Sequence, residues 1–157
     1  MTGWRGWVAG LCAAGACLTA VAADGGGAPA AASPRGNPLQ AERWKTRPLV
    51  VVVPAADAPL LAQVRRALEQ PAARAGFVER EMVLYTVVDG KGARDGQPLT
   101  PAQTGAMLAA LDLPPGAGAI LALVGKDGGT KLVERDEAFD LQRIFALVDG
   151  MPMRQPR

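Results

Sequence analysis

A run of aliphatic residues at Leu49–Val53 is the strongest constraint on what this chain can fold into. It reads Leu-Val-Val-Val-Val and is closed by Pro54. Successive β-branched side chains favour an extended backbone, and a run without polar alternation is typical of a strand buried on both faces. Such a strand needs a layer of helices on each side of its sheet. The run therefore predicts a three-layer α/β domain.

The segments after this strand alternate between helical and extended patterns. Asp57 is expected to cap a helix that has Pro59 in its first turn, and Pro71 to end or kink that helix. Gly150 is expected to end the last helix as a left-handed cap. The remaining predicted elements are a strand at Met82–Val88, a turn-rich segment at 89–96, a helix after the Thr100–Gln103 capping box, a strand at 119–124, a second at 130–134 and a helix at 139–148.

The predicted order is β-α-β-α-β-β-α. Crossover helices imply parallel pairing of the first strands, and the Gly-rich turn at Asp127–Gly129 indicates a closing antiparallel hairpin. We therefore expect an α/β domain of thioredoxin-like topology, with a mixed four-stranded sheet and helices on both faces.

The N-terminal segment has the pattern of an export signal. Arg5 is followed by the uncharged stretch 7–22, which ends in the small residues Ala20-Val21-Ala22. We expect residues 1–22 to be a cleaved signal peptide, 23–38 a disordered Gly/Ala/Pro linker, and 39–157 one folded domain. The location is then periplasmic or secreted, without a stable membrane span after cleavage. Lipidation of Cys17 is the alternative fate of this segment.

The composition of the chain excludes several kinds of chemistry. It has no histidine, both cysteines (Cys12 and Cys17) lie in the predicted signal, and the single serine, Ser33, lies in the predicted linker. The folded domain therefore lacks Ser/His and Cys/His nucleophile pairs, His/Cys zinc sites and thiol redox chemistry. A net charge of +2 gives no sign of a nucleic-acid-binding face. No motif indicates a cofactor.

The helix-start loop Pro54–Pro59, which contains Asp57, is one candidate binding surface, and two further segments are others. The turn with Lys126 and Asp127 could cradle an anion, but we favour a tight hairpin turn. At the C-terminus, Met151, Met153 and Arg154 could form a docking surface, or they could be a structural tail packed beside the last helix.

Another segment, Arg43–Arg47, places Trp44 among three cations. A carbohydrate contact is one interpretation. We favour another, in which Trp44 packs on the sheet edge while Arg43, Lys45 and Arg47 stay solvated.

Carboxylates are the only acid–base groups left for catalysis or for a metal ion. Those near element ends are Asp57, Asp89, Asp127 and Asp149.

Several stretches resemble the exported bacterial family of domain of unknown function 4174. They are Arg43–Arg47, Gly125–Leu132 and the terminal stretch Ile144–Gln155; Glu79-Arg80-Glu81 stands where Glu-Arg-Asp would be expected. The resemblance implies a thioredoxin-like, peroxiredoxin-related fold, secreted animal relatives associated with the extracellular matrix, and no established enzymatic activity. The loop Pro54–Pro59, where redox members of that fold place their cysteine, has none.

We therefore expect a non-catalytic binding module that lacks redox cysteines. Its partner would be an envelope protein or a small ligand that the sequence does not identify. The alternatives are a carboxylate- or metal-dependent enzyme of the cell envelope, and a degenerate oxidoreductase relative that binds peptides at the loop 54–59.

Overall fold

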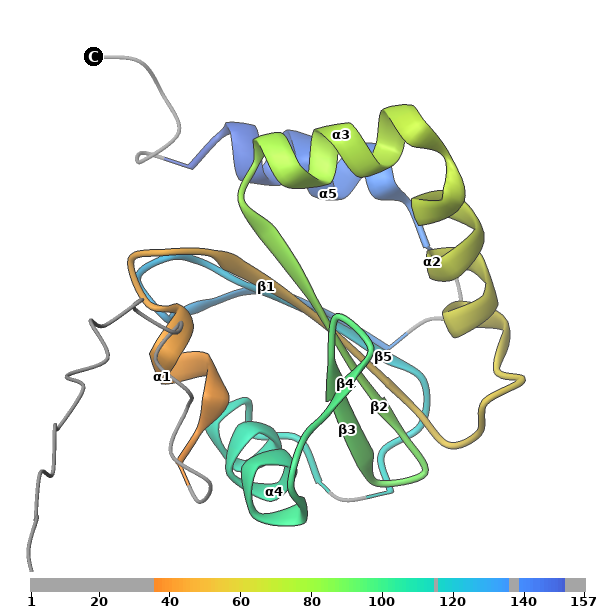
Figure 1. Ribbon diagram of the computed structural model, residues 1–157, viewed down its shortest axis with the longest axis vertical. Coiled ribbons are helices and arrows are strands. Elements are labelled where there is room, and N and C mark those ends of the chain that lie inside the picture. Colours follow the sequence, from red (N-terminus) through yellow and green to blue (C-terminus); the bar gives the residue numbers. More distant parts are fainter. Residues whose placement is uncertain (1–35, 115, 136–138, 152–157) are drawn as a thin grey trace, which may run out of the picture.

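The structure is a computed structural model that describes residues 36–114, 116–135 and 139–151, and it shows a mixed α/β domain (Figure 1). The predicted signal peptide and most of the predicted linker lie outside these residues. No helix in the described ranges is long and apolar enough to cross a membrane. The elements in chain order are α1 (Pro38–Glu42), β1 (Arg47–Val53), α2 (Pro59–Glu69), α3 (Pro71–Glu79), β2 (Met82–Val88), β3 (Lys91–Arg94), β4 (Gln97–Pro98), α4 (Pro101–Ala110), β5 (Ile120–Val124), β6 (Thr130–Glu134) and α5 (Leu141–Asp149).

The sheet has six strands in the order β4-β3-β2-β1-β5-β6, two more than expected. As predicted, β1 and β2 are parallel, and β5 and β6 form an antiparallel hairpin. The extra strands come from the segment predicted as turns. Asp89-Gly90 and Asp95-Gly96 all have positive φ, which is the backbone of two-residue hairpin turns, so β3 folds back onto β2 and β4 folds back onto β3.

The sheet separates two apolar cores, and β1 contributes to both. Leu49, Val51 and Val53 pack in the core beneath α2, α3 and α5, whereas Val50 and Val52 pack in the core beneath α1 and α4. Figure 1 shows these two groups of helices on opposite faces. Every residue of β1 is buried, which confirms the prediction made from the aliphatic run.

Two predictions about helix ends, those at Asp57 and Gly150, were wrong. Ala58, not Asp57, precedes α2, and it caps with no side-chain hydrogen bond. The prediction that Pro71 ends the helix is confirmed, because α2 ends at Glu69. The fixed φ of Pro71 also suits the first turn of α3, a helix that the sequence analysis missed. Gly150 ends α5 with φ −76°, so it is not left-handed.

Three other helix starts rely on side-chain caps, and at α1 the Asn37 side chain accepts from the Leu39 amide at 3.0 Å. The Thr100–Gln103 capping box at α4 is present as predicted, with both reciprocal hydrogen bonds. Asp140 caps α5 by accepting from the amides of Gln142 and Arg143 at 3.0 and 3.1 Å, a cap that the sequence analysis did not identify.

Candidate functional site

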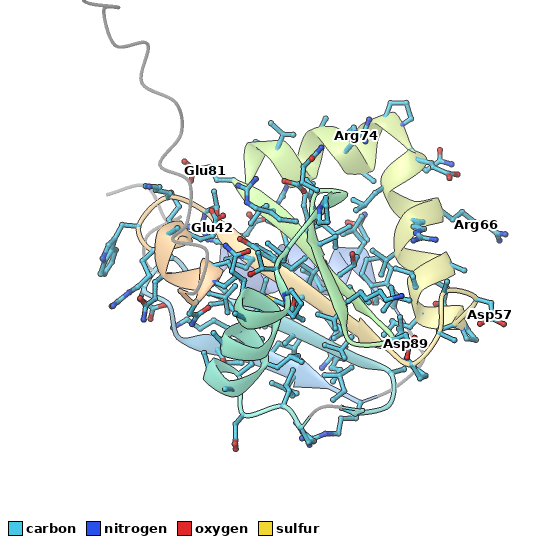
Figure 2. All side chains as sticks on the ribbon, turned by 60° about the horizontal axis from the view of Figure 1, so that its bottom comes forward. Glu42, Asp57, Arg66, Arg74, Glu81 and Asp89 are labelled. Carbon is cyan, nitrogen blue, oxygen red and sulfur yellow. The ribbon has the colours of Figure 1, made fainter. Side chains whose placement is uncertain are left out.

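Segments far apart in sequence meet at one end of the sheet, where β1 and β2 begin and the β5–β6 hairpin turns. We call this surface the basic rim. Glu81 marks it in Figure 2, where Asp57 and Asp89 lie at the opposite end of the molecule. The rim consists of Arg43, Trp44, Lys45, Arg47, Glu81, Lys126, Asp127 and Lys131.

Trp44 is held outward at this rim. Its backbone is left-handed, with φ 64°, and its side chain is 61% exposed. The Trp44 amide donates to the Lys126 carbonyl at 2.7 Å, and the Arg43 guanidinium lies 5.9 Å from the indole centroid. The expectation that Trp44 packs on the sheet edge was therefore wrong. The left-handed backbone and the bond to the hairpin direct its side chain into solvent.

Arg47 has the opposite outcome, because it was expected to be solvated and is only 1% exposed. It donates to the Arg80 carbonyl at 2.9 Å and lies 3.5 Å from the Glu81 carboxylate, while its Nε has no hydrogen-bond partner. The side chain sits at the first residue of β1, a strand covered on both faces, and burial there excludes water. In the segment Arg43–Arg47, the Arg47 side chain is therefore buried and the Trp44 ring is exposed to solvent.

Lys126 and Asp127 hold the hairpin turn together through ion pairs. Lys126 pairs with Glu81, and the hydrogen bond from Lys126 holds the pKa of Glu81 below its ordinary value. Asp127 accepts from Lys131 at 2.6 Å and from the Gly129 amide at 3.2 Å, and the bond from Lys131 lowers the pKa of Asp127. The Gly129 amide is therefore already occupied by a side chain of the turn itself. These contacts agree with a hairpin turn better than with an anion cradle.

Arg43 is fixed on the same turn. Its Nε donates to the Asp127 carbonyl at 3.1 Å. Gly128 has φ 83°, and a Cβ added there would lie 3.0 Å from Arg43 Nε. Gly128 therefore allows the positive φ of the turn and leaves room for the Arg43 side chain to pack against the turn.

Charge is unbalanced at the basic rim. Glu81 is shared by Lys126 and Arg47, and Asp127 is paired with Lys131. Arg43 bonds only a carbonyl among the described residues, and Lys45 is exposed. The cations of the rim thus exceed its carboxylates, which favours an anionic partner. The cations are Arg43, Lys45, Arg47, Lys126 and Lys131.

The C-terminal candidates are only partly described. Asp149 ends α5 and pairs with Arg80 at 2.7 Å, and Arg80 stacks 4.3 Å from the Phe145 ring. Met151 is half-buried against the core beneath α2, α3 and α5, as the structural interpretation of the tail expects. Met153 and Arg154 lie outside the described residues.

The remaining candidate carboxylates lie apart from the rim. Asp57 and Asp89 are exposed near the carboxyl ends of β1 and β2. A cavity of about 400 Å³ opens at that end, and its lining includes Pro54, Asp89 and Thr104. Within the described ranges, no three acidic, histidine or cysteine side chains are grouped to hold a metal ion.

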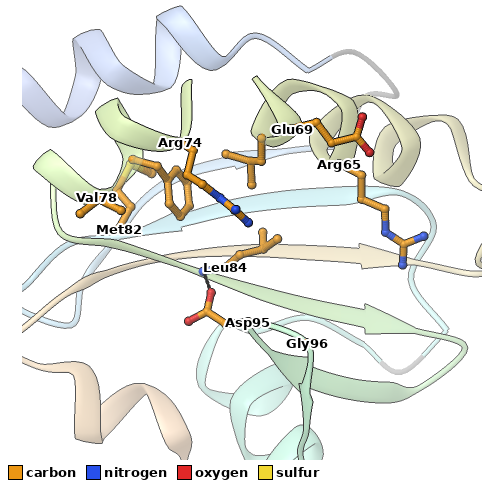
Figure 3. Close-up of a pocket in the computed structure, with 10 residues that line it drawn as sticks. Arg65, Glu69, Arg74, Val78, Met82, Leu84, Asp95 and Gly96 are labelled. Atoms are coloured by element: carbon orange, nitrogen blue, oxygen red, sulfur yellow. Dashed lines mark hydrogen bonds between the residues drawn. The ribbon is translucent and has the colours of Figure 1, made fainter. Parts of the chain in front are cut away.

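A larger groove of about 700 Å³ lies between the α2–α3 pair and the sheet (Figure 3). Its floor is apolar, and its charged side chains balance: two arginines accompany two carboxylates. Asp95 is already engaged, since it accepts from the Leu84 amide at 3.2 Å. The charged lining residues are Arg65, Arg74, Glu69 and Asp95.

Behind the rim, a buried carboxylate anchors α1, and sequence reasoning missed it. Glu42 is 6% exposed and accepts from Thr46 Oγ1 at 2.6 Å, Tyr85 Oη at 2.9 Å and Arg94 Nε at 2.7 Å. Burial opposes ionisation, but these hydrogen bonds hold the pKa of Glu42 below its ordinary value. Burial and the adjacent Glu42 raise the pKa of Tyr85. The network fixes the segment that leads directly into Arg43 and Trp44.

Comparison with known proteins gives one match. A family model described as a domain of unknown function (DUF4174) matches residues 38–157, a range that begins at the first residue of α1. No curated protein and no solved structure matches the chain significantly.

Proposed function

Because this chain belongs to the DUF4174 family, whose description names no reaction, we propose that it is an exported, non-catalytic binding module. We further propose that its fold is thioredoxin-like. The order β2-β1-β5-β6 within the sheet, with helices on both faces, supports this assignment. The module binds its partner through the basic rim.

The observation that carries this proposal is the conformation of Trp44. A left-handed backbone costs a bulky residue about 1–2 kcal/mol. The ring offsets little of this cost by burial, since it is 61% exposed. Backbone strain at a bulky residue whose side chain stays exposed is typical of functional positions. Trp is also among the residues that dominate protein interfaces when a partner covers them.

The carboxylates of the rim support binding over catalysis. Glu81 and Asp127 are both ion-paired, and the pKa of each is lowered by its lysine. Both are therefore ionised at neutral pH and hold no proton to donate, whereas a general acid needs a raised pKa.

Substitution of Trp44 tests the proposal, because binding and stability should separate. Trp44→Gly removes the ring and suits φ 64°, so the free energy of unfolding should stay unchanged or rise by up to about 1 kcal/mol. Trp44→Val also removes the ring, but a β-branched residue is strained at this φ and should destabilise the fold by about 1 kcal/mol. Urea unfolding measures both changes.

Both variants should lose the proteins that the immobilised wild-type chain retains from cell-envelope extract, identified by mass spectrometry. Leu147→Ala is the control, because Leu147 is an exposed apolar residue on α5 and belongs to none of the rim segments. If Trp44→Gly retains the same proteins as the wild type, the rim is not the binding surface.

A further inference from the structure

We propose that the partner of the basic rim is an acidic polypeptide segment that adds as a strand to the free edge of β6. This inference deepens the proposed function and rests on it. It names the occupant of the rim and the way in which its backbone is recognised.

The first argument is the position of β6. It is the last strand in the order β4-β3-β2-β1-β5-β6 and pairs only with β5 among the described strands. Thr130, Lys131 and Val133 are exposed along it. An edge strand presents backbone N–H and C=O groups that a further extended chain can pair with. A polypeptide has the matching backbone groups, whereas a polysaccharide or a lipid headgroup does not.

The second argument is the place of Trp44 relative to this edge. The Trp44 amide and the Arg43 guanidinium bind the carbonyls of Lys126 and Asp127, and this turn leads directly into β6 at Thr130. A strand added to β6 would therefore end near the turn on which Arg43 and Trp44 are held. Val133, which is 39% exposed, offers a second apolar contact further along β6.

The third argument is charge. The rim carries more cations than carboxylates, and Lys45 is exposed with no ion pair among the described residues. Acidic side chains on an added strand would meet this positive surface, and like-charged chains would be repelled. The groove of Figure 3 offers no comparable bias, because its charges balance.

Trp44 itself can report the binding. In full-length chain carrying Trp4→Phe and Trp7→Phe, Trp44 is the only tryptophan, and its fluorescence can be followed during titration. The probes are a blocked six-residue peptide of alternating Glu and Val, the same peptide with Lys in place of Glu, and the Glu peptide N-methylated at alternate residues on its hydrogen-bonding side. Polygalacturonate is the anionic probe without a peptide backbone.

The Glu peptide should bind at least tenfold more tightly than the Lys peptide and the N-methylated peptide, and raised salt should weaken its binding. Lys45→Glu should weaken binding of the Glu peptide at least fivefold. Lys91→Glu, an exposed lysine on β3, should leave it unchanged.

Equal binding of the N-methylated peptide would overturn strand addition, and equal or tighter binding of polygalacturonate would overturn a polypeptide partner. Absence of binding by the Glu peptide would also overturn this inference. The proposed function itself would stand as long as capture from envelope extract still depends on Trp44.

Discussion

At the scale of single residues, one buried carboxylate positions the candidate site. Glu42 lies immediately before Arg43 and Trp44. Its hydrogen bonds from Tyr85 and Arg94 tie α1 to β2 and β3, and a third comes from nearby Thr46. Thr46 is close to Glu42 in sequence, whereas Tyr85 and Arg94 are distant from it. A lone glutamate at the end of a short helix carries no sequence signal of burial, because its partners are brought to it by tertiary structure.

Removal of this carboxylate should destabilise the protein. Glu42→Ala leaves the buried Tyr85 hydroxyl without its acceptor, so the free energy of unfolding should fall by about 2–3 kcal/mol in urea titration. Glu69→Ala on α2 is the control, because Glu69 is exposed, and its effect should stay within about 0.5 kcal/mol. Similar losses for the two variants would show that the network contributes little.

At the scale of elements, the sequence predicted best where the signal is local. The aliphatic run gave β1, and the Thr100–Gln103 pair gave the start of α4, since each depends on neighbouring residues. The strands β3 and β4 were missed, although Asp-Gly at 89–90 and 95–96 is the usual signal of two-residue hairpins. The basic rim was missed for a different reason. Arg47 is buried and Trp44 is exposed because the Trp44 amide binds the β5–β6 hairpin at Lys126. Lys126 lies 82 residues after Trp44 in the chain, so the pattern of neighbouring residues carries no signal of this contact.

Two helical glycines should respond in opposite ways to an added methyl group. A Cβ at Gly76 on α3 would lie 2.8 Å from the Phe145 ring of α5, so Gly76→Ala should destabilise the protein by about 1–3 kcal/mol. A Cβ at Gly105 on α4 meets nothing within 4 Å, so Gly105→Ala should stabilise it by about 0.5–1 kcal/mol. Thermal unfolding compares the two. Stabilisation by both variants would mean that α3 and α5 do not pack tightly.

At the scale of the whole molecule, the ionised carboxylates make stability depend on pH. The pKa values of Glu42, Glu81 and Asp127 are all lowered in the folded chain. Their contribution to stability is present above the ordinary carboxyl pKa of about 4 and is lost as pH falls through the lower folded values. The raised pKa of Tyr85 acts at the other limit, where stability falls once pH rises above the ordinary tyrosine pKa of about 10.

Urea midpoints should therefore be level near neutral pH and fall both below about pH 4 and above about pH 10. In Glu42→Gln the acid decline should be shallower, because this side chain no longer takes up a proton. Midpoints that stay constant from pH 6 to pH 3 would show that these carboxylates are equally stabilised in the unfolded chain.

The central sheet also bears on how this domain can change. The helices α1 and α4 rest on one core, and α2, α3 and α5 rest on the other, with the sheet as a wall between them. Substitutions under one helical layer can be compensated by neighbours in that layer alone. The two helical layers can therefore vary in sequence almost independently of each other. The residues of β1 pack against both cores, so a substitution there must suit the core on its own side of the sheet.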